Sequence, residues 1–444
     1  MNRQSLFNFL LSIAYYFTKL SCIINLPYLT ALIIKFSLRK STFILTKKKT
    51  TKTIIVLEKS YGTDDLIESY KNKISDINFL ILQRQFFRVI FQHFLGRFSK
   101  DQIRETKYLT NDPYIENQKI KYRFYLIKTI QHLKKLQNFD SFLSFNLFYI
   151  TERELQQACK KLNTKFIVCH KESVCTKKLN KLRVYMWNKL IGKCFATAIC
   201  VYNNYTRDSM ISSRVIDKNK ITVSGMPRAD NYFKKEKENK KKYRNYILFL
   251  MIERNAQLPY VENYWFPSIL RQNIKFFTWK KNAHLTTKTI LDFAKSRPDL
   301  NFIFKTKPKT SEEEFKLFRK YSLNNCKLIQ GGSSTDLIKN SKYIIAFNTT
   351  GIFEGMILNK KIIVPTFQNN KIEKGFTFSL NNKDIYQPRT IKKMKYYLES
   401  LSNIKNNSEK IKIKKVYIKY IKEHLCNTDG KAGRRLRKFI SDNI

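Results

Sequence analysis

The chain has 444 residues, of which 43% are hydrophobic and 14% are aromatic, so it is not a disordered chain and is too long for one ordinary hydrophobic core. Lysine and arginine number 85 against 34 aspartate and glutamate residues, which gives a formal net charge of +51. Such a charge attracts polyanions, phosphorylated substrates or an anionic membrane surface.

The positive charge has two interpretations. The lysines are spread through most of the chain and accompany abundant asparagine and isoleucine, a pattern that codon bias toward A and T produces as readily as selection for an anionic partner does. No RNA- or DNA-binding motif accompanies the charge, so nucleic acid is not expected as a partner. The eight cysteines form no CxxC pair, so no metal site is expected.

Two apolar pieces separated by Lys19 make up most of the first fifty residues, SLFNFLLSIAYYF and LSCIINLPYLTALIIKF. Neither reaches the roughly 20 uninterrupted apolar residues that a membrane-spanning helix needs. Basic residues follow at Arg39, Lys40 and 47–49. We therefore favour an interfacial helix or hairpin on an anionic inner leaflet, with a spanning helix and ordinary core helices as the alternatives.

Short β-branched runs alternate with helical patterns from residue 53 onward. The runs that predict strands are 53–58, 78–82, 139–145, 165–170, 196–203 and 220–227, and the helical patterns cover 83–136, 151–163 and 204–214. Strands that alternate with helices predict a parallel sheet with helices on both faces.

A second series of strands and helices follows the charged stretch 234–244, which is too rich in like charges to pack into a core. Strands are predicted at 246–251, 300–307, 326–330 and 343–347, and helices at 285–296, from Ser311, at 334–341 and from Gly351. Two such halves predict two facing, doubly wound α/β domains with a ligand cleft at the carboxyl ends of their strands. The expected divisions are 1–50, 51–233, the linker 234–244, 245–400 and the helices of 401–444.

Several phrases occur in a fixed order over roughly residues 139–440. They are NLFYITERELQQACKKLNTKFIVCHKES, KITVSGMPRADNYF, NFIFKTKPK, STDLIKNSKYIIAFNTTGIFEGMILNKKIIVPTF and NTDGKAGRRLRKFI. Together they resemble the GT-B glycosyltransferases of bacterial capsule and lipopolysaccharide assembly. Polyglycerol-phosphate polymerases and sugar-nucleotide 2-epimerases are more distant relatives. The first 140 residues depart from the family pattern.

The resemblance implies a GT-B-like fold of two Rossmann-like domains and a metal-independent, inverting glycosyltransferase. A nucleotide-sugar would be the donor substrate, with no further cofactor, and a surface polysaccharide or lipid-linked glycan would be the acceptor. Residues 51–233 would bind the acceptor and 245–400 the donor nucleotide, and 401–444 would pack back across the cleft. The expected location is cytoplasmic, peripheral at the inner face of the membrane.

Three other functions stay open. Polyol-phosphate transfer and sugar-nucleotide 2-epimerisation use the same fold, although the histidine of the relatives' Lys-x-His-Pro phrase is replaced here by Lys307. A basic membrane- or nucleic-acid-binding protein without catalysis is the alternative of another class.

The donor's phosphates have two predicted groups of ligands. Lys305 and Lys307 follow a strand and project to one side, where two ammonium groups suit a diphosphate leaving group, although lysines at these positions also arise by chance in so basic a chain. Asn348, Thr349 and Thr350 end another strand, just before a helix whose N–H groups favour phosphate oxygens.

Glu354, inside that helix, is expected to accept hydrogen bonds from the donor's ribose or sugar hydroxyls. A capping-box carboxylate that bonds back to the loop is the alternative. Ser334 and Thr335 open an earlier helix after two glycines, where they either contact an anion or cap the helix.

The acceptor side has its own candidates at the end of strand 165–170. His170, Lys171 and Glu172 combine a base, a cation and a carboxylate, and either His170 or Glu172 would take the acceptor hydroxyl's proton. The alternative for His170 is a strand-end residue satisfied by the backbone.

The phrase SGMPRAD closes the first half at the expected interdomain seam. Gly225 allows a bend and close backbone approach, Arg228 suits a phosphate or carboxylate, and Asp230 either fixes Arg228's ligand or caps the next helix. A structural Arg–Asp pair at a strand end is the plainer interpretation.

Overall fold

The chain folds into two compact units, and each is described by itself. One unit comprises Met1–Ser173, Arg183–Asp230 and Lys431–Ile444, and the other comprises Val174–Leu182 and Asn231–Gly430. We call them unit 1 and unit 2. The computed structural model describes residues 3–47, 52–58, 62–99, 102–105, 107–171, 173–234, 245–252, 280–306, 312–367, 375–380, 383–403 and 413–444.

Unit 1 is built on a seven-stranded sheet with the order β1-β5-β3-β6-β7-β8-β9. Its strands are β1 (Arg39–Lys40), β3 (Lys52–Glu58), β5 (Ile77–Gln83), β6 (Ser141–Ser144), β7 (Lys165–His170), β8 (Ala198–Val201) and β9 (Ile221–Val223). Every pairing is parallel except that of the short edge strand β1 with β5. The parallel sheet predicted from residue 53 onward is therefore confirmed.

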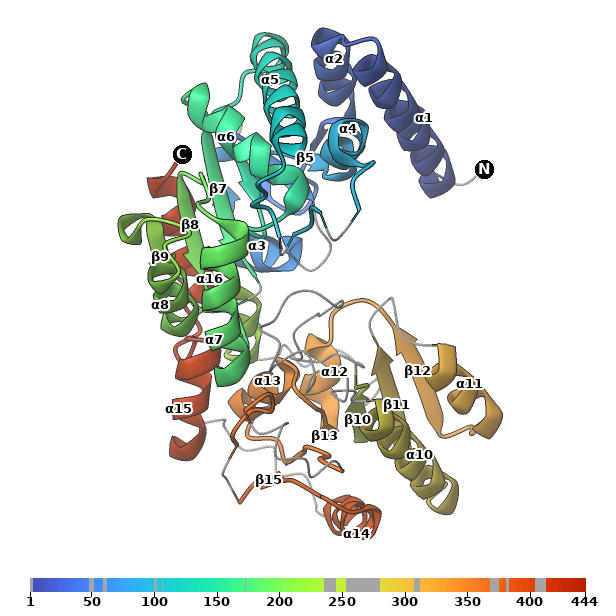
Figure 1. The fold of residues 1–444 in the computed structure, drawn as a ribbon. Coiled ribbons are helices and arrows are strands. Elements are labelled where there is room, and N and C mark those ends of the chain that lie inside the picture. Colours follow the sequence, from blue (N-terminus) through green and yellow to red (C-terminus); the bar gives the residue numbers. More distant parts are fainter. Residues whose placement is uncertain are drawn as a thin grey trace. The chain divides into compact units, whose positions relative to one another are not determined.

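Helices cover both faces of this sheet (Figure 1). Ile54 and Val56 of β3 face a core shared with α3 (Thr63–Tyr70) and α16 (Ala432–Asp442), whereas Ile55 and Leu57 face the opposite core. Because successive side chains of a strand point to opposite faces, a run of four apolar residues fits a strand that is buried on both sides. The opposite core is covered by α1 (Arg3–Ile23), α2 (Pro27–Ser37), α4 (Gln85–Leu95), α5 (Pro113–Leu136), α6 (Arg153–Lys161) and α8 (Asn204–Ser212).

The helical region expected over 83–136 is two helices, α4 and α5. Helix α4 ends at Leu95, before Gly96. Helix α5 starts after Asp112, whose carboxylate accepts hydrogen bonds from the N–H groups of Tyr114 and Ile115, and Pro113 occupies its first position. These are standard start signals for a helix, so the chain restarts instead of continuing.

Unit 2 contains a six-stranded parallel sheet with the order β12-β11-β10-β13-β14-β15. Its strands are β10 (Tyr246–Leu250), β11 (Asn301–Thr306), β12 (Cys326–Gln330), β13 (Ser341–Ile345), β14 (Ile362–Ile363) and β15 (Ile385–Tyr386). Its helices include α10 (Lys280–Ser296), α11 (Glu312–Tyr321), α12 (Thr335–Asn340), α13 (Gly351–Ile357), α14 (Ile391–Ser402) and α15 (Lys415–His424). One sheet that is parallel except at its edge strand β1, a second that is wholly parallel, and an apolar N-terminal helix confirm the predicted α/β fold class.

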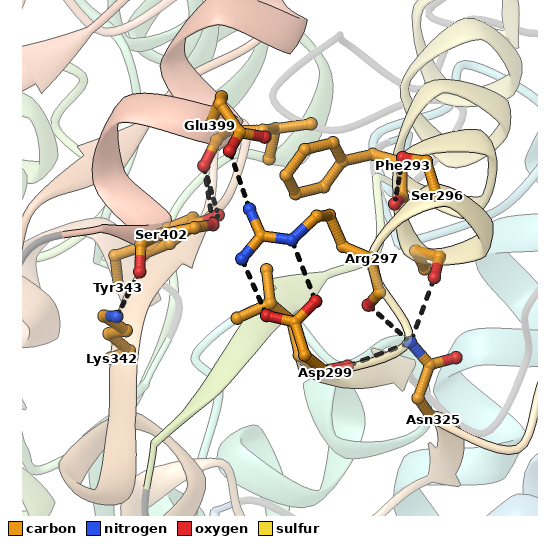
Figure 2. A network of polar contacts seen from close by, with 12 residues as sticks. Phe293, Ser296, Arg297, Asp299, Asn325, Lys342, Tyr343, Glu399 and Ser402 are labelled. Carbon is orange, nitrogen blue, oxygen red and sulfur yellow. Dashed lines mark hydrogen bonds and ion pairs between the residues drawn. The ribbon is translucent and has the colours of Figure 1, made fainter.

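A polar network fixes the carboxyl end of α10 (Figure 2). The Asn325 side-chain amide donates to the carbonyl oxygens of Ala294, Arg297 and Leu300, at 3.0, 3.1 and 2.9 Å. The Arg297 guanidinium pairs with Asp299 below the helix end and with Glu399 of α14. Two of these carbonyls also accept backbone N–H groups, Ala294 from Arg297 and Arg297 from Leu300, so the amide adds a second set of hydrogen bonds to the turn that follows α10.

We expect Asn325→Asp to lower the free energy of unfolding by roughly 2 kcal/mol, because a carboxylate cannot donate to these three carbonyl oxygens. Chemical denaturation of the full chain measures the loss. Arg297→Ala is the control: it removes exposed ion pairs and should cost less than Asn325→Asp. An Asn325→Asp variant as stable as the natural protein would contradict the role given to the amide.

Candidate functional site

Lys305 lies at the carboxyl end of β11, with 7% of its surface exposed. Its ammonium donates to the Thr306 carbonyl at 2.9 Å, and among the described residues no carboxylate pairs with it. Burial lowers the pKa of Lys305 below its ordinary value. An ammonium that is removed from water without a counter-ion is unfavourable, so this position favours an anion that supplies the missing charge.

A glycine turn lies beside Lys305. The Thr306 carbonyl also accepts from the N–H of Gly331, at 3.0 Å. Gly331 and Gly332 have φ angles of +66° and +73°, in the left-handed region that favours glycine, and a Cβ added to Gly332 would meet nothing within 4 Å. The lysine and an open stretch of backbone therefore share one corner of the sheet edge.

Ser334 and Thr335 follow this turn, and neither caps α12 in the predicted way. The hydroxyl of Ser333 accepts the N–H of Thr335 at 3.2 Å, whereas Ser334, at the N-cap position, makes no capping hydrogen bond. Ser333 does the capping because its side chain reaches two residues ahead, as in an ST turn. A contact of Ser334 or Thr335 with an anion stays a prediction.

The strand next to β11 connects Lys305 to the loop before α13. Lys305 pairs with Leu250 of β10, so the two side chains lie on the same face of the sheet. Leu250 packs against Gly351, where an added Cβ would lie 2.2 Å from a Leu250 methyl. Because Gly351 has no side chain, the first turn of α13 can approach Leu250 of β10, and Leu250 lies next to Lys305 on the neighbouring strand.

The three polar residues before α13 differ in their surroundings. Asn348 has a φ of +46°, and its side-chain amide donates to the Phe376 carbonyl and accepts from the N–H of Phe378. Its amide therefore joins this loop to 376–378, a structural task that the sequence did not reveal. Thr349 and Thr350 are half-buried, and within the described ranges their hydroxyls make no hydrogen bond. The two threonines keep the freedom to bind a ligand, and phosphate contact stays a prediction for all three.

Glu354 is buried, with 3% of its surface exposed. One carboxylate oxygen accepts from the Tyr232 hydroxyl at 2.6 Å, and the other has no hydrogen-bond partner in the part of the chain that the structure describes. Among the described residues the Glu354 carboxylate accepts from Tyr232 and not from the loop before α13, and the N-cap residue Thr350 makes no side-chain cap either. The capping-box alternative is therefore wrong, and one oxygen is left to accept a ligand hydroxyl.

An aromatic cluster that the sequence analysis missed includes Phe353, the residue before Glu354. His424 of α15 stacks on Phe353 with ring centroids 4.1 Å apart and meets Phe378 at 5.1 Å. Burial, with a smaller contribution from Lys177, lowers the pKa of His424 to about 4. Phe353 precedes Glu354 in α13, so this neutral histidine supports the helix that carries the carboxylate.

The predicted acceptor-side base His170 is buried at the end of β7, with 2% of its surface exposed. Its Nδ1 accepts from the N–H of Leu147 at 3.3 Å, as expected for a strand-end residue that the backbone satisfies. Lys171, half-buried, follows directly and joins the loop after β6 through its backbone N–H. Glu172 lies outside the described residues.

A second polar group at the same edge of unit 1 centres on Asp65. This buried carboxylate accepts from the Tyr202 hydroxyl and from the backbone N–H of Arg228, and it pairs with the Arg228 guanidinium at 3.4 Å. Arg228 also donates to the Tyr202 hydroxyl at 3.1 Å. Arg228 therefore takes part in a structural Arg–Asp pair, with a partner that the sequence analysis did not single out.

Asp64 precedes Asp65 in the chain. Its carboxylate does not share the hydrogen bonds that Asp65 accepts from Tyr202 and Arg228. It lies half-buried in the first turn of α3, at the carboxyl end of β3. Burial raises the pKa of Asp64, and the nearby charges of Arg228 and Lys171 partly oppose that shift. A half-exposed carboxylate of raised basicity between two cations is a suitable proton acceptor. The signal in the sequence was the phrase GTDD, which begins at Gly62, shortly after β3 ends at Glu58.

Asp230 caps a helix, one of its two predicted roles, but the helix is α16. Its carboxylate accepts the N–H groups of Ala432 and Gly433, at 3.0 and 2.8 Å. Arg435 donates to the Ser224 carbonyl at 2.6 Å, next to Gly225, whose φ is +80°. The SGMPRAD phrase thus holds the C-terminal helix on unit 1, which explains its polar residues without a ligand.

Arg84 and Glu152 form a further ion pair at this edge, which the sequence analysis also missed. The Arg84 Nε donates to Glu152 at 2.5 Å, and the Ser144 hydroxyl donates to the other oxygen of Glu152. The guanidinium lies 3.4 Å from the centre of the Tyr149 ring. Burial raises the pKa of Glu152, and Arg84 opposes that rise. Because both oxygens are engaged and the side chain is fully buried, we assign this pair to structure.

The structure brings the candidate residues together within each unit. In unit 2, Lys305, the 331–332 turn and the start of α13 share the carboxyl edge of one sheet, and Glu354 lies one turn into α13. In unit 1, Asp64, Asp65, Lys171, Tyr202 and Arg228 share the corresponding edge. Lys307 lies outside the described residues. Within the described ranges, no group of three His, Cys, Asp or Glu side chains lies close enough to hold a metal ion.

The sequence matches no family model, and it matches no curated protein. Solved structures with a related arrangement include a putative UDP-N-acetylglucosamine 2-epimerase from Listeria monocytogenes, with 10% identity over 88% of this chain and 96% of that one, and a TM-score of 0.46. A UDP-GlcNAc 2-epimerase from Neisseria meningitidis, bound to UDP-GlcNAc, has 12% identity over 88% and 100% of the chains and a TM-score of 0.45. A UDP-forming trehalose-phosphate synthase from Burkholderia xenovorans has 8% identity over 89% and 99% and a TM-score of 0.42. Because identity is this low and these TM-scores lie below 0.5, we draw no conclusion about activity from the likeness.

Proposed function

We propose that the chain is a metal-independent, inverting glycosyltransferase of the GT-B type. It would move a sugar from a nucleotide-activated donor to a capsular or lipopolysaccharide glycan, or to its lipid-linked precursor. The observation that carries this proposal is Lys305, a buried ammonium at the carboxyl edge of a parallel sheet with no carboxylate partner among the described residues. That edge is where doubly wound α/β domains bind their ligands.

In this proposal unit 2 holds the donor. Lys305, the hydroxyls of Thr349 and Thr350, and Lys307 bind the diphosphate, and the uncommitted oxygen of Glu354 accepts from ribose or sugar hydroxyls. As the bond between the sugar carbon and the phosphate oxygen breaks, negative charge grows on the leaving diphosphate. Lys305 stabilises that charge, which lowers the barrier for transfer.

Unit 1 supplies the base for the acceptor hydroxyl. The hydroxyl oxygen attacks the anomeric carbon, a carboxylate takes the hydroxyl's proton, and the nucleoside diphosphate leaves with the bonding electrons. Asp64 is the carboxylate best placed by its exposure and raised pKa. Glu172 and His170 stay as predicted alternatives, although the Nδ1 of His170 already accepts a backbone hydrogen bond.

The proposal is tested by the binding of UDP, CDP, GDP and CMP to the full chain in the presence of EDTA, measured by thermal shift and calorimetry. We expect one nucleotide to raise the melting temperature without metal. If none does so, or if the shift requires metal, the metal-independent transferase is overturned. A nucleotide-sugar that changes its sugar configuration without an acceptor would instead show the 2-epimerase, and transfer from a CDP-polyol would show the polyol-phosphate transferase.

Lys305→Gln should weaken binding of that nucleotide by roughly 30-fold, because hydrogen bonds to charged groups contribute about 1.5–3 kcal/mol and the amide keeps only a neutral donor. Lys327→Gln is the matched control, an exposed lysine of the neighbouring strand β12. Calorimetric titration of both variants measures the effect. Equal affinities in the two variants would remove Lys305 from the phosphate site.

A further inference from the structure

Helix α1 has one apolar face that packs on unit 1. Leu11, Ala14 and Tyr15 lie against the core under α4, and the ring of Tyr15 meets Phe86 at 4.8 Å. Ser21 shares a hydrogen bond with Thr30 of α2, and Thr30 shares another with the Tyr125 hydroxyl of α5. Figure 1 shows α1 beside α2 and α4, with its N-terminal end extending beyond them. Packing therefore fixes α1 as part of the unit.

The opposite face of α1 is also apolar and is exposed. Its residues recur at helical spacing, three or four positions apart or next to one another, and we call them the outer stripe: Leu6, Phe9, Leu10, Ile13, Phe17 and Leu20. Between 37% and 57% of each residue's surface is exposed. Ordinary surface helices carry polar residues on this face, so an uninterrupted apolar stripe indicates contact with something other than water.

The surrounding charge identifies the kind of partner. Before Glu58 the sequence has nine Lys and Arg residues and no Asp or Glu. Lys19 on α1 and Lys35 on α2 are among them, and Phe36 beside Lys35 has 75% of its surface exposed. Apolar side chains flanked by cations fit a bilayer with anionic headgroups. Two copies of so positive a region would repel one another, which disfavours a dimer.

The packed face decides how α1 meets the bilayer. The segment Ser5–Ile23 is long and apolar enough to cross a membrane. A helix that crosses, however, has lipid or other spanning helices on all sides, and α1 would lose its contacts with Phe86 and Thr30. At about 1.5 Å per residue its 21 residues are roughly 31 Å long, enough to lie flat along the interface.

We propose that α1 lies in the plane of an anionic membrane leaflet and inserts its outer stripe among the lipids, while its packed face stays on unit 1. This inference does not depend on the proposed transferase activity. It selects the interfacial helix among the three predicted alternatives for the N-terminal segment.

Flotation of the full chain with vesicles tests the docking. We expect binding to vesicles of phosphatidylcholine with 30% phosphatidylglycerol, and at least tenfold weaker binding to phosphatidylcholine alone. Phe9→Gln/Ile13→Gln/Phe17→Gln should reduce binding to the anionic vesicles at least tenfold. Asn8→Gln/Ser12→Gln, exposed positions of α1 outside the stripe, is the matched control and should bind like the natural protein. Circular dichroism and the melting temperature verify that each variant is folded.

Several outcomes would overturn the proposal. They are no binding by the natural protein, equal binding by the stripe variant, or a dimer in solution that the stripe substitutions abolish without any vesicle binding. Orientation is tested with single tryptophans at Leu6, Ile13 and Leu20, with the native tryptophans replaced by phenylalanine. Brominated lipids should quench the three positions at one common depth, whereas a graded depth would show a spanning helix.

Discussion

Asp64→Asn is expected to lower kcat by 10²- to 10⁴-fold and to leave the affinity for the donor nucleotide unchanged. The amide is nearly isosteric with the carboxylate but cannot take a proton, and general-base catalysis contributes a factor of about this size. The donor affinity stays because the nucleotide-binding residues proposed here belong to unit 2, whereas Asp64 belongs to unit 1. Steady-state kinetics with the donor identified by nucleotide binding, together with calorimetry, measures both quantities.

Asp208→Asn is the control for this prediction, because Asp208 is an exposed carboxylate of the same unit, paired only with its neighbour Arg207 among the described residues. An Asp64→Asn variant with normal kcat would return the role of base to Glu172 or His170. A variant that loses donor affinity as well would show that Asp64 acts in binding. The donor must first be identified by the thermal shift that its nucleotide causes. If no nucleotide binds, the proposed function has failed before the kinetics of Asp64→Asn are measured.

The fold could be predicted from the sequence because its strands are buried on both faces. Runs such as 53–58 and 165–170 are nearly continuous in apolar residues, and helices between them leave the parallel sheet as the simplest solution. Short edge elements were missed. Strand β1 consists of Arg39 and Lys40, which carry no apolar signal, and β15 has only two residues.

The candidate site was predictable only as far as parallel strands place residues at one edge. That rule placed Lys305 and Asn348 at the edge of unit 2 and His170 at the edge of unit 1, where the structure has them. It could not find partners far apart in the sequence, such as Asp65 with Tyr202 or Asp230 with Ala432, which are separated by 137 and 202 residues. Such pairs depend on which helices pack together, and the spacing of residues along the chain does not indicate which helices do so.

His424 predicts a specific dependence of unit 2 on pH. Burial in the Phe353 and Phe378 cluster lowers its pKa to about 4, against about 6.5 in the unfolded chain. The unfolded state therefore binds more protons between these values, so the stabilisation is fully present above pH 6.5 and is lost as pH falls toward 4. From the shift we expect a loss of about 2 kcal/mol between pH 7 and pH 5.

Hydrogen exchange of the amides in α13 and α15, corrected for the intrinsic effect of pH, measures this loss as a change in the free energy of local opening. His424→Phe keeps an aromatic ring against Phe353 and has no group that titrates, so its opening free energy should change less between pH 7 and pH 5. Phe378→Leu is the comparison variant. It loosens the same cluster and should lower the opening free energy at both pH values, and because Phe378 supplies part of the burial around His424, it should reduce the pH difference by less than His424→Phe does. If His424→Phe retains the full pH dependence, a group other than His424 titrates. The stability of the helix that carries Glu354 would then not depend on the protonation of His424.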